Sequence, residues 1–225
     1  ANAFLATKIS FINEVANVCE VVGADIDMVK EGIGSDKRIG KAFLYAGLGY
    51  GGSCFPKDVR ALQQFANHKG YDFKLIKSVI EVNEQQRVLF INKLKKHLKD
   101  LKNKEILVLG LAFKANTDDV RESAAIDIIK RLQAEGAKIR AYDPAALITA
   151  QAVLDGEVKY VGSPLDGAKG ADAIVIATEW PEFKNLDWQQ IKSVVNKPII
   201  VDGRNLLDAK LLRALGFTYE GVGRR

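Results

Sequence analysis

Cysteine and histidine are scarce in this 225-residue sequence, which contains two of each. Cys19 and Cys54 form no C-x-x-C pair and no Cys/His cluster, which argues against a metal site. Two thiols, with no recognisable secretion signal at the start, predict a reduced, cytoplasmic protein. His68 and His97 both lie in polar, helix-compatible stretches. We therefore expect both on the surface and expect no histidine-based catalysis.

Long apolar runs and strong charge patches are missing as well. No run of about 18 apolar residues exists, so no membrane span is expected. The lysine-rich stretch at 93–104 has no interleaved aromatic residues, which a nucleic-acid surface would have. We interpret it as the solvated face and end of a helix. The mild net charge of +5 suits a small anionic ligand, with neither nucleic acid nor membrane as a partner.

The first hundred residues predict helices. Apolar residues within 1–22 recur with a period of about 3.6, and Gly23 suits the position after a helix end. Asp25 can cap a second helix through Ile33, Pro56 can start a third to about His68, and a long amphipathic helix covers about 73–98. Between them, 34–53 is a glycine-rich loop. The sequence begins inside the first helix without a capping residue, so we expect these residues to be part of a longer chain.

From residue 104 the pattern changes to short apolar runs that alternate with amphipathic segments. Such alternation predicts an α/β fold with a doubly wound parallel sheet. We place the boundary near 101, giving a helical domain at 1–100 and an α/β domain at 101–225. The expected strands are 105–110, 137–144, 158–161, 171–178, 198–201 and 217–222, and the expected helices are 121–136, 146–154, 187–195 and 206–215.

Cys54 lies in GYGGSCFPKDV and is the first candidate for chemistry. Two glycines precede it and a helix starts directly after it, where the positive end of the helix dipole favours thiolate. Lys57 adds positive charge, whereas Asp58 opposes thiolate formation and can exchange protons or hold a water. The alternative is a buried cysteine at a helix start beside two exposed charges. Cys19 fits the apolar stripe of the first helix and is expected in the core.

Loops after the predicted strands are the second candidate region, because α/β sheets bind ligands at the carboxyl ends of their strands. In LVLGLAFKANTDDVRES, the residues after Gly110 do not continue a G-x-G-x-x-G fingerprint. Lys114 and Arg121 remain candidate phosphate contacts, or basic residues of a solvated loop. Asp143 can bind a ribose, although AYDP is also an ordinary strand-to-turn sequence. Arg204 in VDGRN can reach an anionic ligand at the same edge.

Taken together, several segments resemble one family. GYGGSCFPKD, LGLAFK with DDVRES, YDP, TEW and VDGRN are similar, in this order, to segments of the UDP-glucose and GDP-mannose dehydrogenases. ANAFLATKISFINE resembles the long central helix that joins the two halves of those enzymes, and RIGKAFL with DGRN most resembles the UDP-glucose branch. The resemblance covers essentially the whole sequence. It implies a helical central dimerisation domain followed by a Rossmann-like domain that binds the UDP-sugar.

The resemblance also implies a reaction, the NAD-dependent oxidation of C6 of a nucleotide sugar from alcohol to carboxylate in two steps. Cys54 would attack the aldehyde to give a thiohemiacetal, which is oxidised to a thioester and hydrolysed. Asp58 would position or activate water, and Asn2 would help to stabilise an oxyanion. The family's NAD-binding domain and a lysine four residues before Asn2 are not in this sequence. We therefore expect no turnover by these residues alone.

Further roles follow from the resemblance by position. Arg38 would reach substrate across a homodimer, and Lys57 and Arg121 would lie near NAD. Substrate contacts would come from Phe43, Leu44, Tyr45, Tyr50 and Gly51 of one loop, and from Phe113, Lys114 and Arg204 of the α/β domain. Two alternatives stay open: a sister enzyme acting on GDP-mannose or a UDP-amino sugar, and a non-catalytic nucleotide-binding or dimerisation module. A thiol hydrolase is disfavoured because neither histidine lies in a motif.

Overall fold

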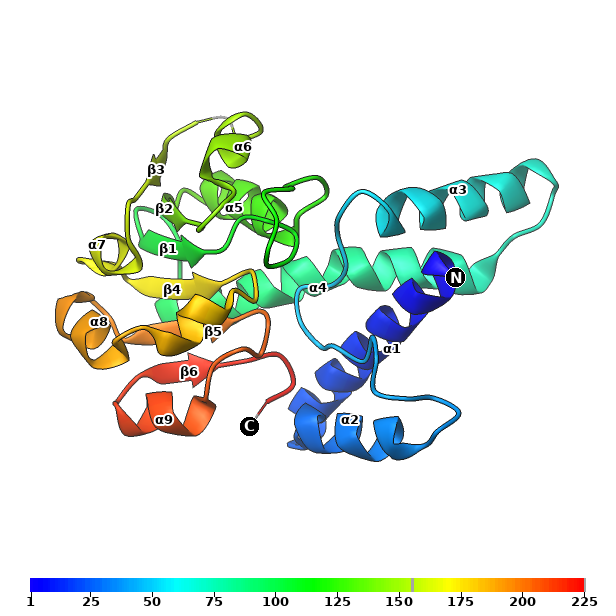
Figure 1. Cartoon of the computed structure of the whole chain (residues 1–225), viewed down its shortest axis with the longest axis horizontal. Coiled ribbons are helices and arrows are strands. Elements are labelled where there is room, and N and C mark those ends of the chain that lie inside the picture. The colour runs from blue at the N-terminus through cyan, green and yellow to red at the C-terminus, as the bar shows by residue number, and fades with distance from the viewer. Residues whose placement is uncertain (155, 225) are drawn as a thin grey trace.

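The computed structural model describes residues 1–154 and 156–224, and Figure 1 shows a helical part followed by a sheet covered with helices. In the helical part, α1 crosses α4 and packs on α3. Gly23 ends α1 in a left-handed conformation (φ 72°), and the side chain of Asp25 caps α2. The helices of this part are α1 (Asn2–Val22), α2 (Ile26–Ser35), α3 (Phe55–His68) and α4 (Lys74–Leu98).

The second part is a six-stranded, fully parallel sheet in the order β3-β2-β1-β4-β5-β6. This arrangement confirms the predicted helical region followed by a doubly wound α/β fold. The strand order reverses between β1 and β4, and ligands bind α/β sheets at the carboxyl ends of strands at such a point. The strands are β1 (Glu105–Leu109), β2 (Lys138–Tyr142), β3 (Val158–Tyr160), β4 (Ala173–Ile176), β5 (Ile199–Asp202) and β6 (Thr218–Glu220).

Alternate residues of the strands enter two buried layers. Val108 of β1 belongs to the layer that includes α5 and the second half of α4, and Leu109 belongs to the layer that includes α8 and α9. Because Phe90 of α4 and Ile12 of α1 share the first layer with Val108, one continuous core joins the helical part to the sheet. The helices around the sheet are α5 (Ala124–Ala134), α6 (Leu147–Gln151), α7 (Pro164–Ala168), α8 (Trp188–Val194) and α9 (Ala209–Ala214).

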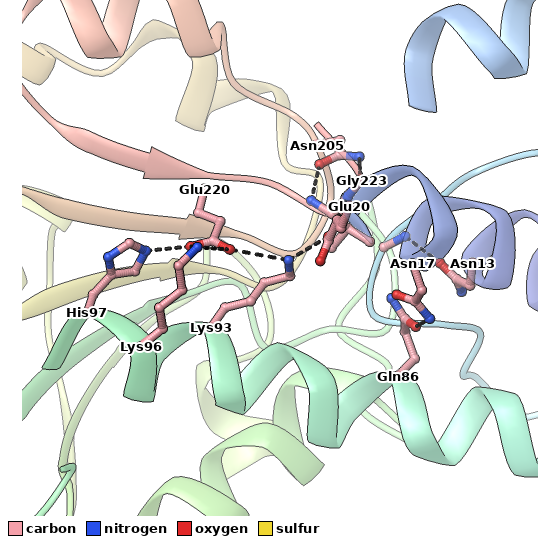
Figure 2. Close-up of polar contacts among 12 residues, drawn as sticks. Asn13, Asn17, Glu20, Gln86, Lys93, Lys96, His97, Asn205, Glu220 and Gly223 are labelled. Carbon is pink, nitrogen blue, oxygen red and sulfur yellow. Dashed lines mark hydrogen bonds and ion pairs between the residues drawn. The ribbon is translucent and has the colours of Figure 1, made fainter. Parts of the chain in front are cut away.

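Two short helices and two basic side chains differ from the sequence-based expectations. α7 and the 3-10 helix η1 (Pro181–Asn185) were not predicted, and each is only five residues long. Lys93 is buried against Glu20 (2.5 Å) and Glu220 (3.4 Å), and the half-buried His97 bonds to Glu220 (Figure 2). The expectation that both side chains are solvated was therefore wrong, because acidic partners arrive from α1 and β6. His68 is exposed, as expected.

Within the described ranges, none of the helices is both long enough and apolar enough to span a bilayer.

Candidate active site

Cys54 is exposed and occupies the N-cap position of α3. Its carbonyl accepts the first helical hydrogen bond, from Asp58 N at 2.9 Å, and its Sγ lies 3.6 Å from Ser53 Oγ. The alternative of a buried cysteine at this position is therefore wrong. Cys19, in contrast, is buried in the core, as predicted. An exposed thiol at a helix N-terminus can act as a nucleophile.

Asn2 and Asp58 lie side by side, although 56 positions separate them in the sequence. Asn2 Nδ2 donates to Asp58 Oδ2 at 2.7 Å, and Lys57 Nζ is 3.7 Å from Asp58 Oδ1. The first turns of α1 and α3 thus converge one helical turn after Cys54. The three residues predicted to be catalytic are all found at this junction.

The loop before Cys54 runs along the carboxyl edge of the sheet. Leu48 N donates to Gly203 O at 3.0 Å, and Gly52 N donates to Arg121 O at 3.1 Å. A Cβ on Gly47 would come within 2.5 Å of Gly203 O, and a Cβ on Gly51 would collide with the carbonyl of Glu122. The glycines thus let two backbones approach where a side chain would not fit.

Gly47, Gly49 and Gly52 reproduce the letters of a G-x-G-x-x-G fingerprint, but their setting differs from that of a dinucleotide site. They lie in a loop that follows no strand. Each one faces protein: Gly203, Asn83 and Phe113, respectively. The match to G-x-G-x-x-G at these positions therefore does not indicate a phosphate-binding loop.

Phe113 and Arg204 meet at the switch point of the sheet. Arg204 Nε donates to Ala177 O at 2.8 Å and lies 3.3 Å from Glu179 Oε2, while Nη2 is 3.4 Å from Phe113 O. The ring of Phe113 contacts Gly52, two residues before Cys54. Lys114 is exposed, with its Nζ 5.3 Å from the centre of the Phe113 ring. The structure thus places the predicted nucleotide contacts beside the thiol loop.

A basic groove of about 660 Å³ lies next to Ser53, between α3 and the entry to α5. It is lined by Lys57, Arg60 and Arg121, together with Gln64 and Glu122. Hydrogen bonding to Asp119 raises the pKa of Arg121, and the nearby Cys54 side chain contributes to a smaller extent in the same direction. Arg121 and the Cys54 thiol are therefore within electrostatic range of each other. The groove fits anionic phosphate groups better than neutral ligands.

Other predicted contacts are distributed along the loop. Arg38 is 88% exposed and pairs with Asp36, so its guanidinium faces solvent. The side chain of Leu44 is buried in the core, which leaves only its backbone for a ligand. Tyr45 is exposed and stacks obliquely against Phe43, whereas the buried Tyr50 packs edge-on against Phe55.

The hydrogen bonds of Asp143 lie within the protein, which supports the strand-to-turn alternative over a ribose-binding acid. Its buried carboxylate accepts from the backbone N–H groups of four residues and from the indole of Trp180 at 3.0 Å. The four are Leu111, Ala112, Ala145 and Ala146. Asp143 therefore shapes the loop that leads to Phe113.

Asp202 performs the same task at the end of β5, and the sequence analysis missed it. It accepts from the amides of Arg204, Leu206 and Leu207 and from the hydroxyl of Tyr219. Burial raises the pKa of Asp202, and these hydrogen bonds oppose that rise. An aspartate directly after an apolar strand and before a glycine was the signal that could have identified it.

Two models of one family match the sequence. The model described as "UDP-glucose/GDP-mannose dehydrogenase family, central domain" matches residues 1–85. The model described as "UDP-glucose/GDP-mannose dehydrogenase family, UDP binding domain" matches residues 107–209. The chain belongs to the UDP-glucose/GDP-mannose dehydrogenase family. Its thiol loop lies in the central domain of this family, and Phe113 and Arg204 lie in the UDP-binding domain.

Members of the dehydrogenase family resemble the chain along its whole length. UDP-glucose 6-dehydrogenase TuaD of Bacillus subtilis is 51% identical over 224 residues, covering 100% of this chain and 49% of the relative. The UDP-glucose 6-dehydrogenase of Rickettsia bellii is 50% identical over 225 residues. The match covers 99% of this chain and 52% of the relative. The chain therefore spans about half the length of these curated relatives.

Solved structures of dehydrogenases from this family share the fold. A UDP-glucose dehydrogenase from Pyrobaculum islandicum superposes with a TM-score of 0.90 at 40% identity, covering 100% of this chain and 49% of that one. A UDP-D-ManNAc dehydrogenase from Pyrococcus horikoshii superposes with a TM-score of 0.84 at 31% identity. The match covers 99% of this chain and 50% of that one.

Proposed function

We propose that these residues form the central and UDP-binding parts of an NAD-dependent UDP-glucose 6-dehydrogenase, which oxidises UDP-glucose to UDP-glucuronate. The observation that carries the proposal is the contact of the Cys54 loop with the strand-end loops, through Gly52 and Phe113. This contact supports the proposal because the exposed Cys54 thiol belongs to a loop that lies at the carboxyl edge of the sheet, where α/β folds bind ligands. The identity of 51% to a UDP-glucose 6-dehydrogenase favours this substrate over that of a sister enzyme.

The UDP-sugar is held at the carboxyl edge of the sheet. Lys114 and Arg204 contact the diphosphate, and Phe113 packs against the nucleotide or the sugar. The loop with Phe43, Leu44, Tyr45, Tyr50 and Gly51 closes over the sugar, with Leu44 contributing backbone only. C6 of the glucose then points toward Cys54, because Phe113 touches the same loop that carries the thiol.

The cofactor is NAD, and Lys57 and Arg121, which line the basic groove, would hold its anionic groups. The density of cationic side chains there supports this placement. When bound, NAD supplies the hydride acceptor for both oxidations.

The residues of the chain perform the covalent part of the reaction. In the first step the C6 alcohol loses a hydride, for which NAD would be the acceptor, and releases its hydroxyl proton to solvent, which leaves an aldehyde. Cys54 Sγ then adds to the aldehyde carbon, forming a C–S bond and a thiohemiacetal. The thiohemiacetal then loses a second hydride, for which NAD would again be the acceptor, and its hydroxyl proton passes to solvent, which gives a thioester. The covalent adduct thus splits one difficult oxidation into easier steps.

Hydrolysis ends the cycle. Asp58 accepts a proton from water, the resulting hydroxide attacks the thioester carbon, and the C–S bond breaks to release carboxylate and thiol. Asn2 Nδ2 donates to Asp58 Oδ2 at 2.7 Å and thereby orients that carboxylate, and the second hydrogen of the same amide group is the proposed donor to the oxyanion.

The assembly is a homodimer through the helical part, with Arg38 reaching the partner's substrate. Phe4, Phe11 and Val18 support this, because they are spaced by seven on α1 and are 70%, 53% and 59% exposed. A row of exposed apolar side chains on one helix face is typical of an interface. The domain division at residues 100 and 101 and the cytoplasmic location remain predictions.

The test compares two proteins, the 225 residues alone and the same residues joined to a family NAD-binding domain. We expect UDP-glucose-dependent NADH formation only from the second, and UDP binding by both. UDP should displace a bound fluorescent nucleotide, and GDP should not. If the joined protein oxidises only GDP-mannose or a UDP-amino sugar, it catalyses the sister reaction. If it binds nucleotide but turns over none of these substrates, it is a nucleotide-binding module and not an enzyme of this kind.

A further inference from the structure

The backbone of Tyr50, four residues before Cys54, is held from the side by α4. Asn83 Oδ1 accepts from Tyr50 N at 2.8 Å, and Asn83 Nδ2 donates to Tyr50 O at 3.1 Å. Asn83 is buried, and a Cβ on Gly49 would collide with its side chain. The absence of a side chain at Gly49 thus allows Asn83 to form both hydrogen bonds to the backbone of Tyr50.

Arg87 lies one helical turn after Asn83. It contacts both sides of the joint, by which we mean the boundary where the loop at 47–52 of the helical part meets the start of α5. Its Nη2 is 3.4 Å from Tyr50 O, and its Nη1 is 3.4 Å from Asp127 Oδ2 in the first turn of α5. The side chain is only 12% exposed. α5 directly follows Arg121 and Glu122, whose carbonyls face Gly52 and Gly51.

A second ion pair bridges the same joint. Arg60 of α3 binds Glu122 through two hydrogen bonds of 3.1 and 3.2 Å. Together with Tyr50, Asn83 and Arg87, this pair lines a cavity of about 40 Å³ behind the thiol loop. Burial raises the pKa of Tyr50 to about 12, so its phenol is neutral at physiological pH. The charge at the joint therefore comes from the arginines and their acidic partners.

The burial of Arg87 is hard to explain by stability alone. Its Nε is buried and has no hydrogen-bond partner in the described part of the chain. A buried ion pair with an unsatisfied donor is commonly no more stable than apolar side chains of similar size. What the guanidinium offers instead is geometry, because its planar fork can contact a carbonyl and a carboxylate at once.

We propose that Arg87, together with Asn83, is a positioning residue that locks the Gly47–Gly52 loop onto the entry of α5. The lock keeps Cys54 in register with the ligand held by Phe113 and Arg204. Its structural half stands on the contacts above. Its catalytic half rests on the proposed function, and it predicts that losing the lock slows the thiol-dependent second oxidation more than the first, which needs no thiol.

The structural half is tested by amide hydrogen exchange in Arg87→Met, with Arg131→Met as the matched control. Arg131 is the other cation on Asp127, at 2.8 Å, and its side chain is 42% exposed. In Arg87→Met we expect exchange at Tyr50 and Gly52 to rise at least about tenfold, with β1 unchanged. The control should leave both regions unchanged. Unaltered exchange in the loop, or an equal rise in the control, would overturn the lock.

Arg87→Lys provides the second variant. An ammonium keeps the charge but, as a single point donor, cannot span both partners, so we expect a smaller rise in the same loop amides. If Arg87→Met does not fold, this variant decides the question by the same comparison. Wild-type exchange in Arg87→Lys would then contradict the proposal.

The catalytic half is tested by NADH stoichiometry in the chain joined to an NAD-binding domain. For Arg87→Met we expect the ratio of NADH to consumed UDP-glucose to fall from two toward one, with free aldehyde trapped by hydroxylamine. Arg131→Met should keep the ratio at two. An equal slowing of both oxidations would reduce Arg87 to a structural residue. If the wild type itself does not yield two NADH, the proposed function fails, and the exchange experiment still decides the lock.

Discussion

The backbone of Gly52 lies against the ring of Phe113, so that a Cβ at position 52 would come within 2.7 Å of Phe113 Cε2. Gly52 also has a backbone φ of 84°, which residues other than glycine rarely adopt. The contact joins the thiol loop of the helical part to the nucleotide-binding edge of the sheet. Two residues that are 61 positions apart thereby hold the loop that carries the Cys54 thiol against the carboxyl edge of the sheet.

Gly52→Ala should therefore damage both stability and binding. The strained φ and the displaced ring predict a loss of about 1–3 kcal/mol in the free energy of unfolding. We expect UDP to bind about tenfold more weakly, which corresponds to about 1.4 kcal/mol. Denaturant unfolding and titration calorimetry measure the two effects. Gly32→Ala is the control, since its Cβ would meet nothing within 4 Å and alanine favours the helix. Unchanged UDP affinity in Gly52→Ala would contradict the assigned role of Phe113.

Asp58→Asn should stop the cycle at the thioester. Removing the base slows hydrolysis by about 10²–10⁴-fold, while addition of Cys54 to the aldehyde remains possible. Intact-protein mass spectrometry after mixing the variant, joined to an NAD-binding domain, with UDP-glucose and NAD should show a covalent adduct. Asp166→Asn, on the exposed surface of α7, should show none during steady turnover. A slow Asp58→Asn variant without adduct would remove Asp58 from the hydrolytic step.

The sequence predicted the helices and strands better than it predicted the contacts between them. Apolar periodicity, the capping residue Asp25 and the helix-start residue Pro56 identified the four N-terminal helices, and short apolar runs identified the six strands of the sheet, because these signals are local in the sequence. The glycines before Cys54 predicted a loop, but the residues that this loop contacts, Gly203, Glu122 and Phe113, are distant in sequence. Nothing in the local pattern could reveal them.

Polar residues on α4 show the same limit more clearly. Asn83, Arg87 and Lys93 look like the solvated face of an amphipathic helix, yet each is buried or half-buried. Their partners are Tyr50, Asp127 and Glu220, which come from a loop and from both ends of the α/β part. Burial of a charge depends on a partner, and a partner that is remote in sequence leaves no periodic signal.

Asp143→Asn should destabilise the fold without touching a ligand. Five N–H groups point at the carboxylate, and an amide would turn one of its own donors toward them. We expect a loss of roughly 3 kcal/mol in unfolding free energy. Asp118→Asn, at an exposed loop position, should change it by less than about 0.5 kcal/mol. Equal unfolding midpoints for the two variants in denaturant would refute the hub role of Asp143.

Glu220→Gln should remove part of the acid sensitivity of the fold. Burial alone would raise the pKa of Glu220, but Lys93, His97 and Lys96 together outweigh it and hold the pKa below its ordinary value of 4.5 (Figure 2). A lowered folded-state pKa contributes stability above pH 4.5 that is lost as the pH falls through the folded-state value.

The variant should therefore lose about 1–3 kcal/mol near pH 7 and show a shallower decline in unfolding free energy below about pH 4.5. Urea unfolding at a series of pH values measures this, with the exposed Glu14→Gln as control. A variant curve parallel to the wild type at every pH would show that the carboxylate contributes no pH-dependent stability.

The most direct test of the central claim is the NADH yield per UDP-glucose in Cys54→Ser, with the chain joined to an NAD-binding domain. The account predicts two NADH per sugar for the wild type. For Cys54→Ser it predicts at most one, with no UDP-glucuronate formed, because the second oxidation requires the thiohemiacetal. Two NADH and normal UDP-glucuronate from the serine variant would remove the thiol from the mechanism and leave only the shared fold.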